Sequence, residues 1–521
     1  MLFNSYLFLF GFLPLTLLMF FALARFFGPR IAIAGLVIAS FTFYAWWDPV
    51  YLWLIGVSIT ANHFIGLRLS TQAHPKDKTS RRLLTLGVVF NLALLGYYKY
   101  ANFLVANLNA LGMDVHLSAI ILPLGISFFT FTQIAYLVDA YRGEAREYNV
   151  LHYALFITYF PHLIAGPILH HKEIMPQFAN PQTFHFQWEN MAIGLTILVI
   201  GLAKKVLLAD PIGSYVAPAF TAAEQGGQLS FFTAWGGALA YTFQLYFDFS
   251  GYADMAIGTS RMFGIRLPLN FNSPYKATNI IEFWRRWHMT LSRFLRDYLY
   301  IALGGNRKGS MRRYLHLYLT MLIGGIWHGA GWAFVIWGAL HGVYLVINHG
   351  WRELRGYNKA HPPASSGFTQ LACWALTFLA VVVSWVFFRA ETPAGAINLL
   401  QAMAGFNGIE WPSAYTQLLH HIGTAQWGQV ISDILAAAVT DTLPTQALLL
   451  LFLAAIALFL PNTQEIMADY QPAVDFKPDD LTAPSRLRWQ PNPWQAFTVA
   501  VLLVLALSKM NQVSEFLYFQ F

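Results

Sequence analysis

Charged residues and cysteines are scarce in this sequence. Only 11% of its 521 residues are charged, whereas 57% are hydrophobic and 17% are aromatic; soluble domains carry about 25% charged residues. The composition therefore predicts an integral membrane protein. The single cysteine, Cys373, excludes an intrachain disulfide framework and a multi-cysteine metal site. Because it lies in the apolar run LACWALTFLAVVV, we expect a buried and inert thiol.

Common catalytic signatures are missing as well. The sequence contains no HExxH pair, no GxSxG nucleophile elbow and no GxxxxGK[ST] phosphate loop. We therefore expect no metal site and no tightly bound cofactor. The net charge of +7 does not indicate a nucleic-acid partner, because the basic residues interrupt apolar runs, as the positive-inside rule describes. This pattern instead predicts that the protein is surrounded by membrane lipids.

Apolar runs of nearly bilayer-spanning length recur along the whole chain. About 20 apolar residues cross a bilayer as a helix. The first run lacks a preceding basic region and a following cleavage site, so it is predicted to be a retained transmembrane helix rather than a signal peptide. The runs predicted as spans are residues 7–24, 31–47, 52–69, 83–100, 191–208, 231–249, 368–388, 447–460 and 496–507.

Two further apolar segments, residues 117–138 and 153–169, contain proline and glycine. Such breaks free backbone groups, which are tolerated at membrane depth only where protein or a water-lined cavity satisfies them. The fold class predicted is therefore all-α and polytopic, with about 10–12 transmembrane or re-entrant helices. We expect one integral-membrane domain over residues 1–521, with a catalytic core near residues 117–349 and C-terminal helices near residues 368–521.

One short loop predicts the orientation. Residues 68–82 contain five basic side chains and one acidic side chain, so the loop is expected to be cytoplasmic. Counting back through three spans places the N-terminus outside, on the side of the membrane opposite that loop.

Ionisable residues gather between Tyr241 and His341. Burying an unpaired polar group costs roughly 2–7 kcal/mol, so a cluster of this kind in a membrane protein is a candidate functional site. Its members are Asp248, Asp254, Glu282, Arg285, Arg286, His288, Arg293, Arg296, Asp297 and His328.

Residues 283–303 form an amphipathic pattern if they are taken as one helix. At about 100° per residue, Trp284 and His288 share one face, and the arginines lie on the other side. Those arginines are Arg285, Arg286, Arg293 and Arg296. They could bind lipid phosphates at the cytoplasmic interface, or line a cavity and bind the phosphates of an anionic substrate. The pattern is compatible with both.

His328 lies in GGIWHGAGW, a glycine-rich apolar run with few ionisable neighbours. It could be a hydrogen-bonded helix contact, or a general base whose ordinary pKa of about 6.5 suits neutral pH. His341 would face nearly the opposite way on a continuous helix, so the two are not paired. Asp248 and Asp254 could orient a histidine or cap a helix, and Ser250 with Asp254 has the spacing of a cap.

Three stretches, YFDFSGYADMAIG, FNSPYKATNIIEFWRRWHMTLSRFLRDYLYIALGG and IWHGAGWAFVIWGALHG, resemble the membrane-bound O-acyltransferase family. The resemblance is to its bacterial branch of alginate O-acetylation and teichoic acid D-alanyl transfer proteins, and it covers nearly the whole chain. It implies a ring of tilted helices around a central funnel. By the same resemblance His328 matches the family's catalytic histidine and His288 its second histidine. The candidates for substrate or donor binding are Trp284, Arg285, Arg286, Asp248, Ser250 and Trp327.

The resemblance also implies an activity. An acetyl group would pass from a cytoplasmic thioester, with acetyl-CoA as donor substrate, to a hydroxyl presented by a periplasmic partner protein. The partner would then acetylate an exopolysaccharide such as alginate, and the enzyme would lie in the bacterial inner membrane. Two alternatives stay open: a transporter or channel for the acyl donor, and a structural subunit of a polysaccharide-secretion complex.

Overall fold

A computed structural model provides the fold. It describes residues 1–71, 77–147, 149–164, 166–307, 309–356, 366–409, 420, 424, 426, 428–429, 443–474, 476, 487–511 and 517. Over these residues every regular element is helical and no strand occurs, which confirms the all-α prediction. Residues 72–76 of the basic loop and most of residues 410–442 lie outside the described part.

The N-terminal part is a group of antiparallel helices with short connections, in which α1 packs on α2 and α4 packs on α6. It matches the spans predicted from the apolar runs. Its elements are η1 (Leu7–Phe12), α1 (Leu13–Phe27), α2 (Pro29–Ala45), η2 (Pro49–Tyr51), α3 (Leu52–Thr71), α4 (Lys78–Leu95), η3 (Gly96–Tyr100), α5 (Ala101–Ala110) and α6 (Ile126–Arg142).

The two segments predicted to be broken are broken. The first is extended before α6 begins, and the second is divided into α7 and α8 just before Pro161. Gly125 at the start of α6 has a positive φ of 71°, and a Cβ there would lie 2.9 Å from the carbonyl oxygen of Leu163. The elements here are α7 (Val150–Thr158), α8 (Phe160–Leu163), α9 (His171–Ala179), η4 (Pro181–Phe184), α10 (Trp188–Ala203), η5 (Lys204–Ala209), α11 (Asp210–Gly213) and α12 (Val216–Glu224).

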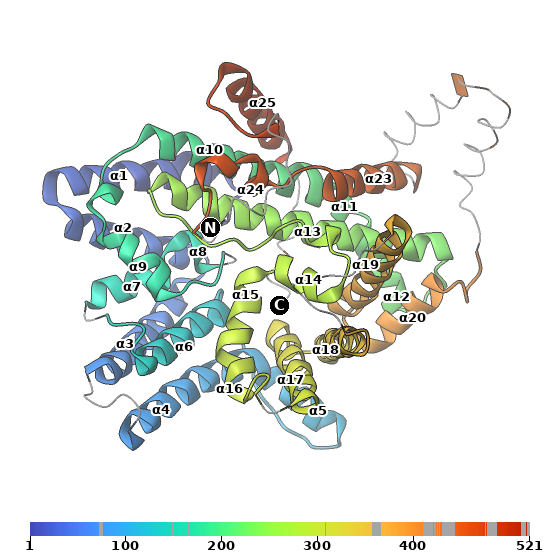
Figure 1. Cartoon of the computed structure of the whole chain (residues 1–521), viewed down its shortest axis with the longest axis horizontal. Helices are drawn as coiled ribbons and strands as arrows, with labels where there is room; N and C mark the ends of the chain where they lie inside the picture. The colour runs from blue at the N-terminus through green and yellow to red at the C-terminus, as the bar shows by residue number, and fades with distance from the viewer. Residues whose placement is uncertain are drawn as a thin grey trace.

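Helix α13 (Phe231–Met262) runs across the middle of the molecule (Figure 1) and is buried on nearly every side. A helix that is apolar all round belongs in a core, and α10, α12, α19 and α23 all pack against it. Its 32 residues extend over about 48 Å. That length exceeds the roughly 30 Å of a bilayer core, so α13 is longer than an upright span requires.

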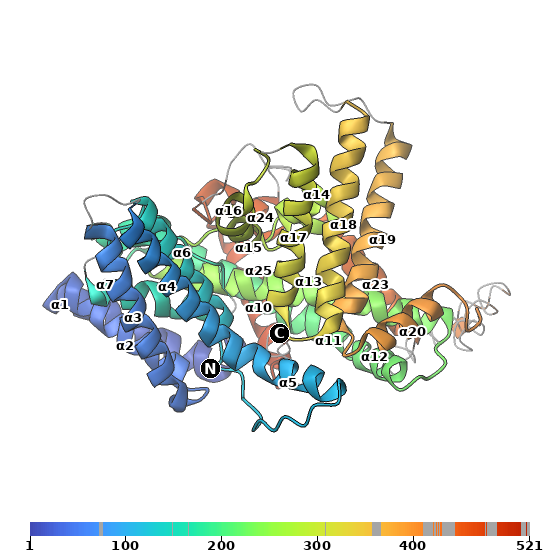
Figure 2. The same ribbon diagram turned by 90° about the horizontal axis from the view of Figure 1, so that it is seen from below.

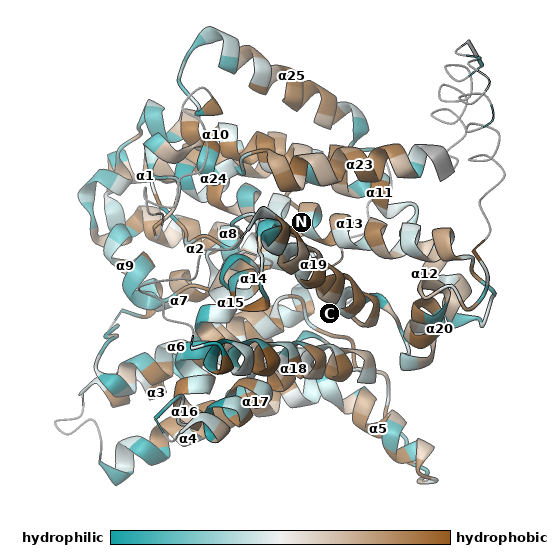
Figure 3. Ribbon diagram, turned by 45° about the vertical axis from the view of Figure 1, so that its right-hand side comes forward, coloured by the Kyte–Doolittle hydropathy of each residue, from teal (hydrophilic) through white to brown (hydrophobic). Residues whose placement is uncertain are grey.

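The remaining helices surround α13, and α18 packs along α17. Figure 3 shows hydrophobic residues along α19, α23 and α25, and hydrophilic residues on α9. The elements are η6 (Pro274–Lys276), α14 (Ile280–Arg286), α15 (Met289–Phe294), η7 (Leu295–Tyr300), α16 (Ile301–Leu303), α17 (Ser310–His328), α18 (Trp332–Leu354), α19 (Gly367–Arg389), α20 (Pro393–Met403), α23 (Leu443–Phe459), α24 (Thr463–Ile466), η8 (Ala468–Tyr470) and α25 (Pro493–Lys509).

Six helical segments in the described part are long and apolar enough to cross a membrane, and three shorter helices are also apolar. The protein is therefore a multi-pass membrane protein. Cys373, expected to be buried, is exposed on α19. The expectation was wrong because an apolar run in a membrane protein can face lipid as readily as the protein interior.

The prediction of one helix over residues 283–303 was also wrong. Helix α14 ends at Arg286, and His288 has a left-handed φ of 41°. The backbone turns there because it pairs with the segment before η6: the N–H of Asn272 donates to the carbonyl of Arg286 (2.9 Å), and that of Met289 donates to the carbonyl of Asn270 (2.9 Å). Left-handed backbone costs a non-glycine residue roughly 1–2 kcal/mol, which these tertiary bonds offset.

Candidate active site

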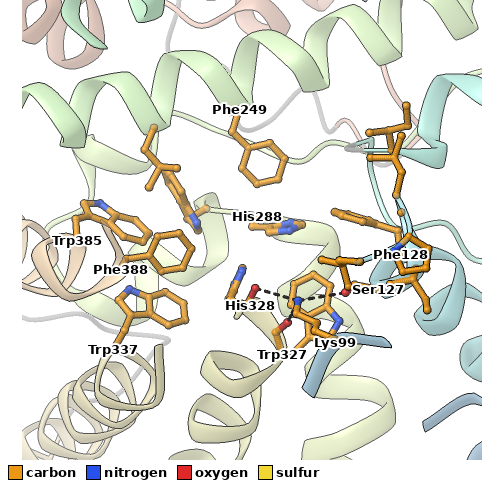
Figure 4. A pocket seen from close by; sticks show the side chains of 18 residues that line it. Lys99, Ser127, Phe128, Phe249, His288, Trp327, His328, Trp337, Trp385 and Phe388 are labelled. Atoms are coloured by element: carbon orange, nitrogen blue, oxygen red, sulfur yellow. Dashed lines mark hydrogen bonds between the residues drawn. The ribbon is translucent and has the colours of Figure 1, made fainter. Parts of the chain in front are cut away.

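A small cavity of about 90 Å³ lies beside the middle of α13, and both predicted histidines line it (Figure 4). Leu245 and Phe249 of α13 form one wall. The other lining residues are Lys99, Leu122 to Phe128, Ile164, Trp287, His288, Trp327, His328, Trp337, Trp385 and Phe388.

His328 is the last residue of α17. The helix stops there because Gly329 and Gly331 are extended, with φ of −158° and −165°. A Cβ at Gly329 would lie 2.1 Å from the Phe334 ring, so only glycine fits this close approach. The imidazole lies among the rings of Trp327, Trp337 and Phe388, at centroid distances of 4.9, 5.0 and 5.1 Å. Its nitrogens have no hydrogen-bond partner among the described residues and are free for a substrate.

His288 is held more rigidly. Its Nδ1 lies 2.9 Å from Asn270 Oδ1, and the same oxygen accepts from the Oγ1 (2.9 Å) and the backbone N–H (3.4 Å) of Thr290. Because the oxygen accepts from a backbone N–H and has only lone pairs to offer, Nδ1 carries the hydrogen. Nε2 therefore has a lone pair, and the buried ring cannot rotate without breaking the bond to Asn270.

The two imidazoles lie close enough to act on one reacting group. Their ring centroids are 6.4 Å apart, and Figure 4 shows both rings between Phe249 and the Lys99 side chain. Proton transfer needs heavy-atom distances of about 2.6–3.2 Å. A hydroxyl between the two rings can therefore contact both of them, which makes the cavity suited to general-base chemistry on a hydroxyl.

Lys99 adds a buried cation at the edge of the cavity. Its Nζ donates to the carbonyl oxygens of Trp327 (2.5 Å) and His328 (3.0 Å) and to Ser127 Oγ (3.2 Å). The Trp327 ring also lies 5.6 Å from the ammonium. Trp327 lines the cavity, as expected for a substrate-binding candidate.

His341 and Trp284 form a separate pair. Trp284 Nε1 donates to His341 Nδ1 at 3.2 Å, and neither residue lines the cavity. The prediction that Trp284 and His288 share a helix face was wrong because the helix ends between them. The sequence argument about His341 and His328 assumed that both lie on one continuous helix. They do not, because the chain reverses at Gly329–Gly331 and α18 packs back on α17.

The arginines do not form one row. Arg286 pairs with Glu282 (2.7 Å), Arg293 with Glu173 (2.7 Å) and Arg296 with Asp297 (2.7 Å). Arg285 is exposed and has no ion-pair partner among the described residues. It is therefore the arginine of this group whose guanidinium is available to an external phosphate.

Asp248, Ser250 and Asp254 lie inside α13, so the helix-cap interpretation was wrong. Asp248 forms a buried ion pair with Lys205, and Asp254 one with Lys204 (2.6 Å). Leu245 and Phe249 face the cavity, whereas neither Asp248 nor Ser250 lines it. The two carboxylates therefore hold α13 to η5, and Asp248 orients neither histidine.

Two functional candidates were missed at the sequence level. Asn270, in NFNSPY, was not singled out, although an asparagine pair just before the histidine segment was a usable signal. Lys99, in YYKYANF, was taken as part of a span end. A lysine between apolar runs does not reveal that two of its three partners lie more than 200 residues further on. Among the described residues, no group of three or more His, Cys, Asp or Glu side chains is placed to hold a metal.

Comparison with known proteins is consistent with this geometry. Residues 38–390 match the family model described as the membrane-bound O-acyltransferase family. The chain is 44% identical over 439 residues to the peptidoglycan O-acetyltransferase of Helicobacter pylori, covering 78% of this chain and 81% of the relative. It is 46% identical over 412 residues to the probable alginate O-acetylase AlgI of Pseudomonas aeruginosa (78% and 75%). It is 29% identical over 279 residues to the teichoic acid D-alanyltransferase of Bacillus subtilis (51% and 69%).

Proposed function

Because this chain belongs to the membrane-bound O-acyltransferase family and is a membrane O-acetyltransferase, we propose that it carries an acetyl group across the inner membrane. The donor is a cytoplasmic thioester, acetyl-CoA, and the acceptor is a hydroxyl on the periplasmic side. Family membership sets aside the transporter and structural-subunit alternatives. The observation that carries the proposal is the pair of imidazoles, His288 and His328, in one cavity.

The chemistry follows from the free nitrogens. His328 accepts the proton of the acceptor hydroxyl as its oxygen attacks the thioester carbonyl. A C–O bond forms and the C–S bond breaks, and the leaving thiolate takes the proton from the His328 imidazolium. His288, whose ring is fixed by Asn270, lies beside the hydroxyl and restricts its position. Holding both reactants at one point can supply effective molarities of about 10⁵–10⁸ M.

The charge distribution supports the direction of transfer. In Figure 2 the end of α3 and the start of α4 lie on the upper side with the end of α18, whereas the N-terminus and α5 lie on the lower side. Arg68, Lys78 and Arg352 occupy those upper helix ends, which supports a cytoplasmic location of the upper side by the positive-inside rule. The cavity is lined by residues 122–125, from the α5–α6 connection. That connection begins on the lower side, which supports access of a periplasmic acceptor to the cavity.

The final acceptor is an exported polysaccharide such as alginate, reached through a periplasmic acetyltransferase partner. The relatives named above support the class of acceptor and not one glycan, because one is named for peptidoglycan and another for alginate at similar identity.

Purified protein with acetyl-labelled acetyl-CoA tests the proposal. We expect hydrolysis or transfer of the label by the wild type and its loss in His328→Ala. His316→Ala is the matched control: His316 lies on the same helix and bonds the carbonyl of Gly305 (2.9 Å), so this variant should lose stability and keep its activity. Label transfer by His328→Ala at the wild-type rate would remove His328 from the mechanism.

A further inference from the structure

The end of the helix that presents His328 is held by side chains from a distant segment. A helix leaves its last four carbonyls without intrahelical partners, and at membrane depth water does not readily replace those partners. Tyr100 donates its hydroxyl to the carbonyl of Ile326 (2.8 Å), and Lys99 bonds the carbonyls of Trp327 and His328. Three consecutive terminal carbonyls of α17 are therefore satisfied by two consecutive residues.

From this arrangement we propose that Lys99 is a positioning residue for His328. The ammonium fixes the last peptide of α17, and through it the place of the imidazole in the cavity. The inference rests on the proposed catalytic role of His328.

The Lys99 ammonium is fully engaged, so it does not bind substrate directly. An ammonium has three N–H donors, and three acceptors surround it: two α17 carbonyls and Ser127 Oγ. No donor is left for a thioester or an oxyanion. Lys99 also lines the cavity, so it connects the wall of the site with the helix that carries His328.

The charge of Lys99 is balanced by the end of a helix and not by a carboxylate. Among the described residues it forms no ion pair with a carboxylate. A cation at a helix C-terminus is stabilised by the partial negative charge of the free carbonyls. Lys99 lies in this position on α17, so its charge is balanced by the helix it holds.

The chain directly after His328 packs against this end of α17 but adds no hydrogen bond to it among the described residues. Gly329 and Gly331 are extended, and α18 begins only at Trp332. In the part of the chain that the structure describes, the hydrogen bond that His328 makes outside its own helix is donated by the Lys99 ammonium to the His328 carbonyl. Lys99 itself lies in the π-helical segment η3; such segments occur frequently at functional sites.

The test compares kcat and KM for acetyl-CoA in purified Lys99→Met, Lys99→Arg and Tyr100→Phe, with thermal stability measured alongside. A displacement of about 1 Å can cost roughly 100-fold in rate. We expect Lys99→Met to lower kcat by about that factor with KM unchanged, and Lys99→Arg to recover part of the loss. Tyr100→Phe removes only the neighbouring bond, to the carbonyl of Ile326, and should lower kcat less than Lys99→Met does.

A wild-type kcat in Lys99→Met would overturn the proposal, and so would a rise in KM as the main effect, which would instead indicate contact with the donor. If Lys99→Met does not accumulate in the membrane, Lys99→Gln decides by the same two criteria. His328→Ala is measured in parallel. Wild-type activity there would refute the proposed function, whatever Lys99 does.

Discussion

Lys99 and Lys205 are both buried lysines in π-helical segments, yet their charges are balanced in different ways. Lys205 in η5 pairs with Asp210 (2.8 Å) and with Asp248 of α13, whereas Lys99 in η3 bonds the end of a helix. Next to Lys205, Lys204 pairs with Asp254, and the Asp254 carboxylate also accepts hydrogen bonds from Thr463 Oγ1 (2.5 Å) and Gln464 Nε2 (3.1 Å) of α24.

The comparison separates two uses of buried polarity in this membrane protein. Around η5, cations and carboxylates are matched, and the result is a contact that holds α10–η5, α13 and α24 together. Around the cavity, the polar groups are two imidazoles, an asparagine and one ammonium on carbonyls. Ion pairs in the cavity would occupy the imidazole nitrogens with which a substrate must form hydrogen bonds. The ionic region therefore determines packing, and the cavity keeps hydrogen-bonding capacity for the reaction.

The largest expected effect is on the ionic region. Lys205→Met leaves Asp248 buried without its cation, and breaking a buried pair in this way costs about 3–5 kcal/mol. We expect a clear fall in the unfolding temperature of the purified protein, with kcat per folded molecule unchanged. Lys205→Met with Asp248→Leu should recover part of the stability, because an apolar pair can replace a buried ion pair. A loss of kcat at unchanged stability would contradict the division between the two regions.

A smaller effect is expected at the cavity. Asn270→Leu removes the acceptor that fixes the His288 ring, and losing the partner that orients a functional histidine costs roughly 10–100-fold. The fall should appear in kcat, with a modest change in unfolding temperature. Asn270→Asp keeps an acceptor oxygen and should lose less activity. If both variants match the wild type, the orientation of His288 does not matter to the reaction.

The next test is at Arg285. It asks whether an exposed guanidinium outside the ionic region binds the acyl donor. A charged hydrogen bond is worth about 1.5–3 kcal/mol, so Arg285→Ala should raise KM for acetyl-CoA about tenfold or more, with little change in kcat. Arg286→Ala should change KM less, because Arg286 is already paired with Glu282. Unchanged KM with lower membrane yield would assign Arg285 to lipid headgroups.

The last test concerns the orientation of the protein in the membrane, and its substitution should perturb the protein least. Thr71→Cys, at the end of α3, is placed on a Cys373→Ser background, where no other cysteine remains. We expect an impermeant thiol reagent to leave it unmodified in intact spheroplasts and to modify it after lysis. Modification before lysis would reverse the topology and the direction of acetyl transfer.

Resemblance and composition predicted the class, the family and the histidine pair, and the family and the all-helical membrane fold are confirmed. The roles of His288 and His328 remain proposals. Apart from the burial expected of Cys373, which is exposed, the failures were of one kind. The single helix over residues 283–303, the cap at Asp248 and the shared face of Trp284 with His288 were read from neighbours in sequence. In the structure these residues take their partners from other helices.

Membrane insertion and helix formation depend on local composition, because each apolar run must satisfy its own backbone and match the bilayer thickness. The sequence alone therefore determined that the chain is a polytopic helical membrane protein with an ionisable segment near its centre. Only tertiary structure decided which polar groups meet. Lys99 reaches the carbonyl of Trp327 across 228 positions of sequence, and Asp248 is neutralised by a lysine of another helix. Buried polar groups require hydrogen-bond partners. Those partners can come from any part of the fold, so the local sequence pattern does not predict which residues they are.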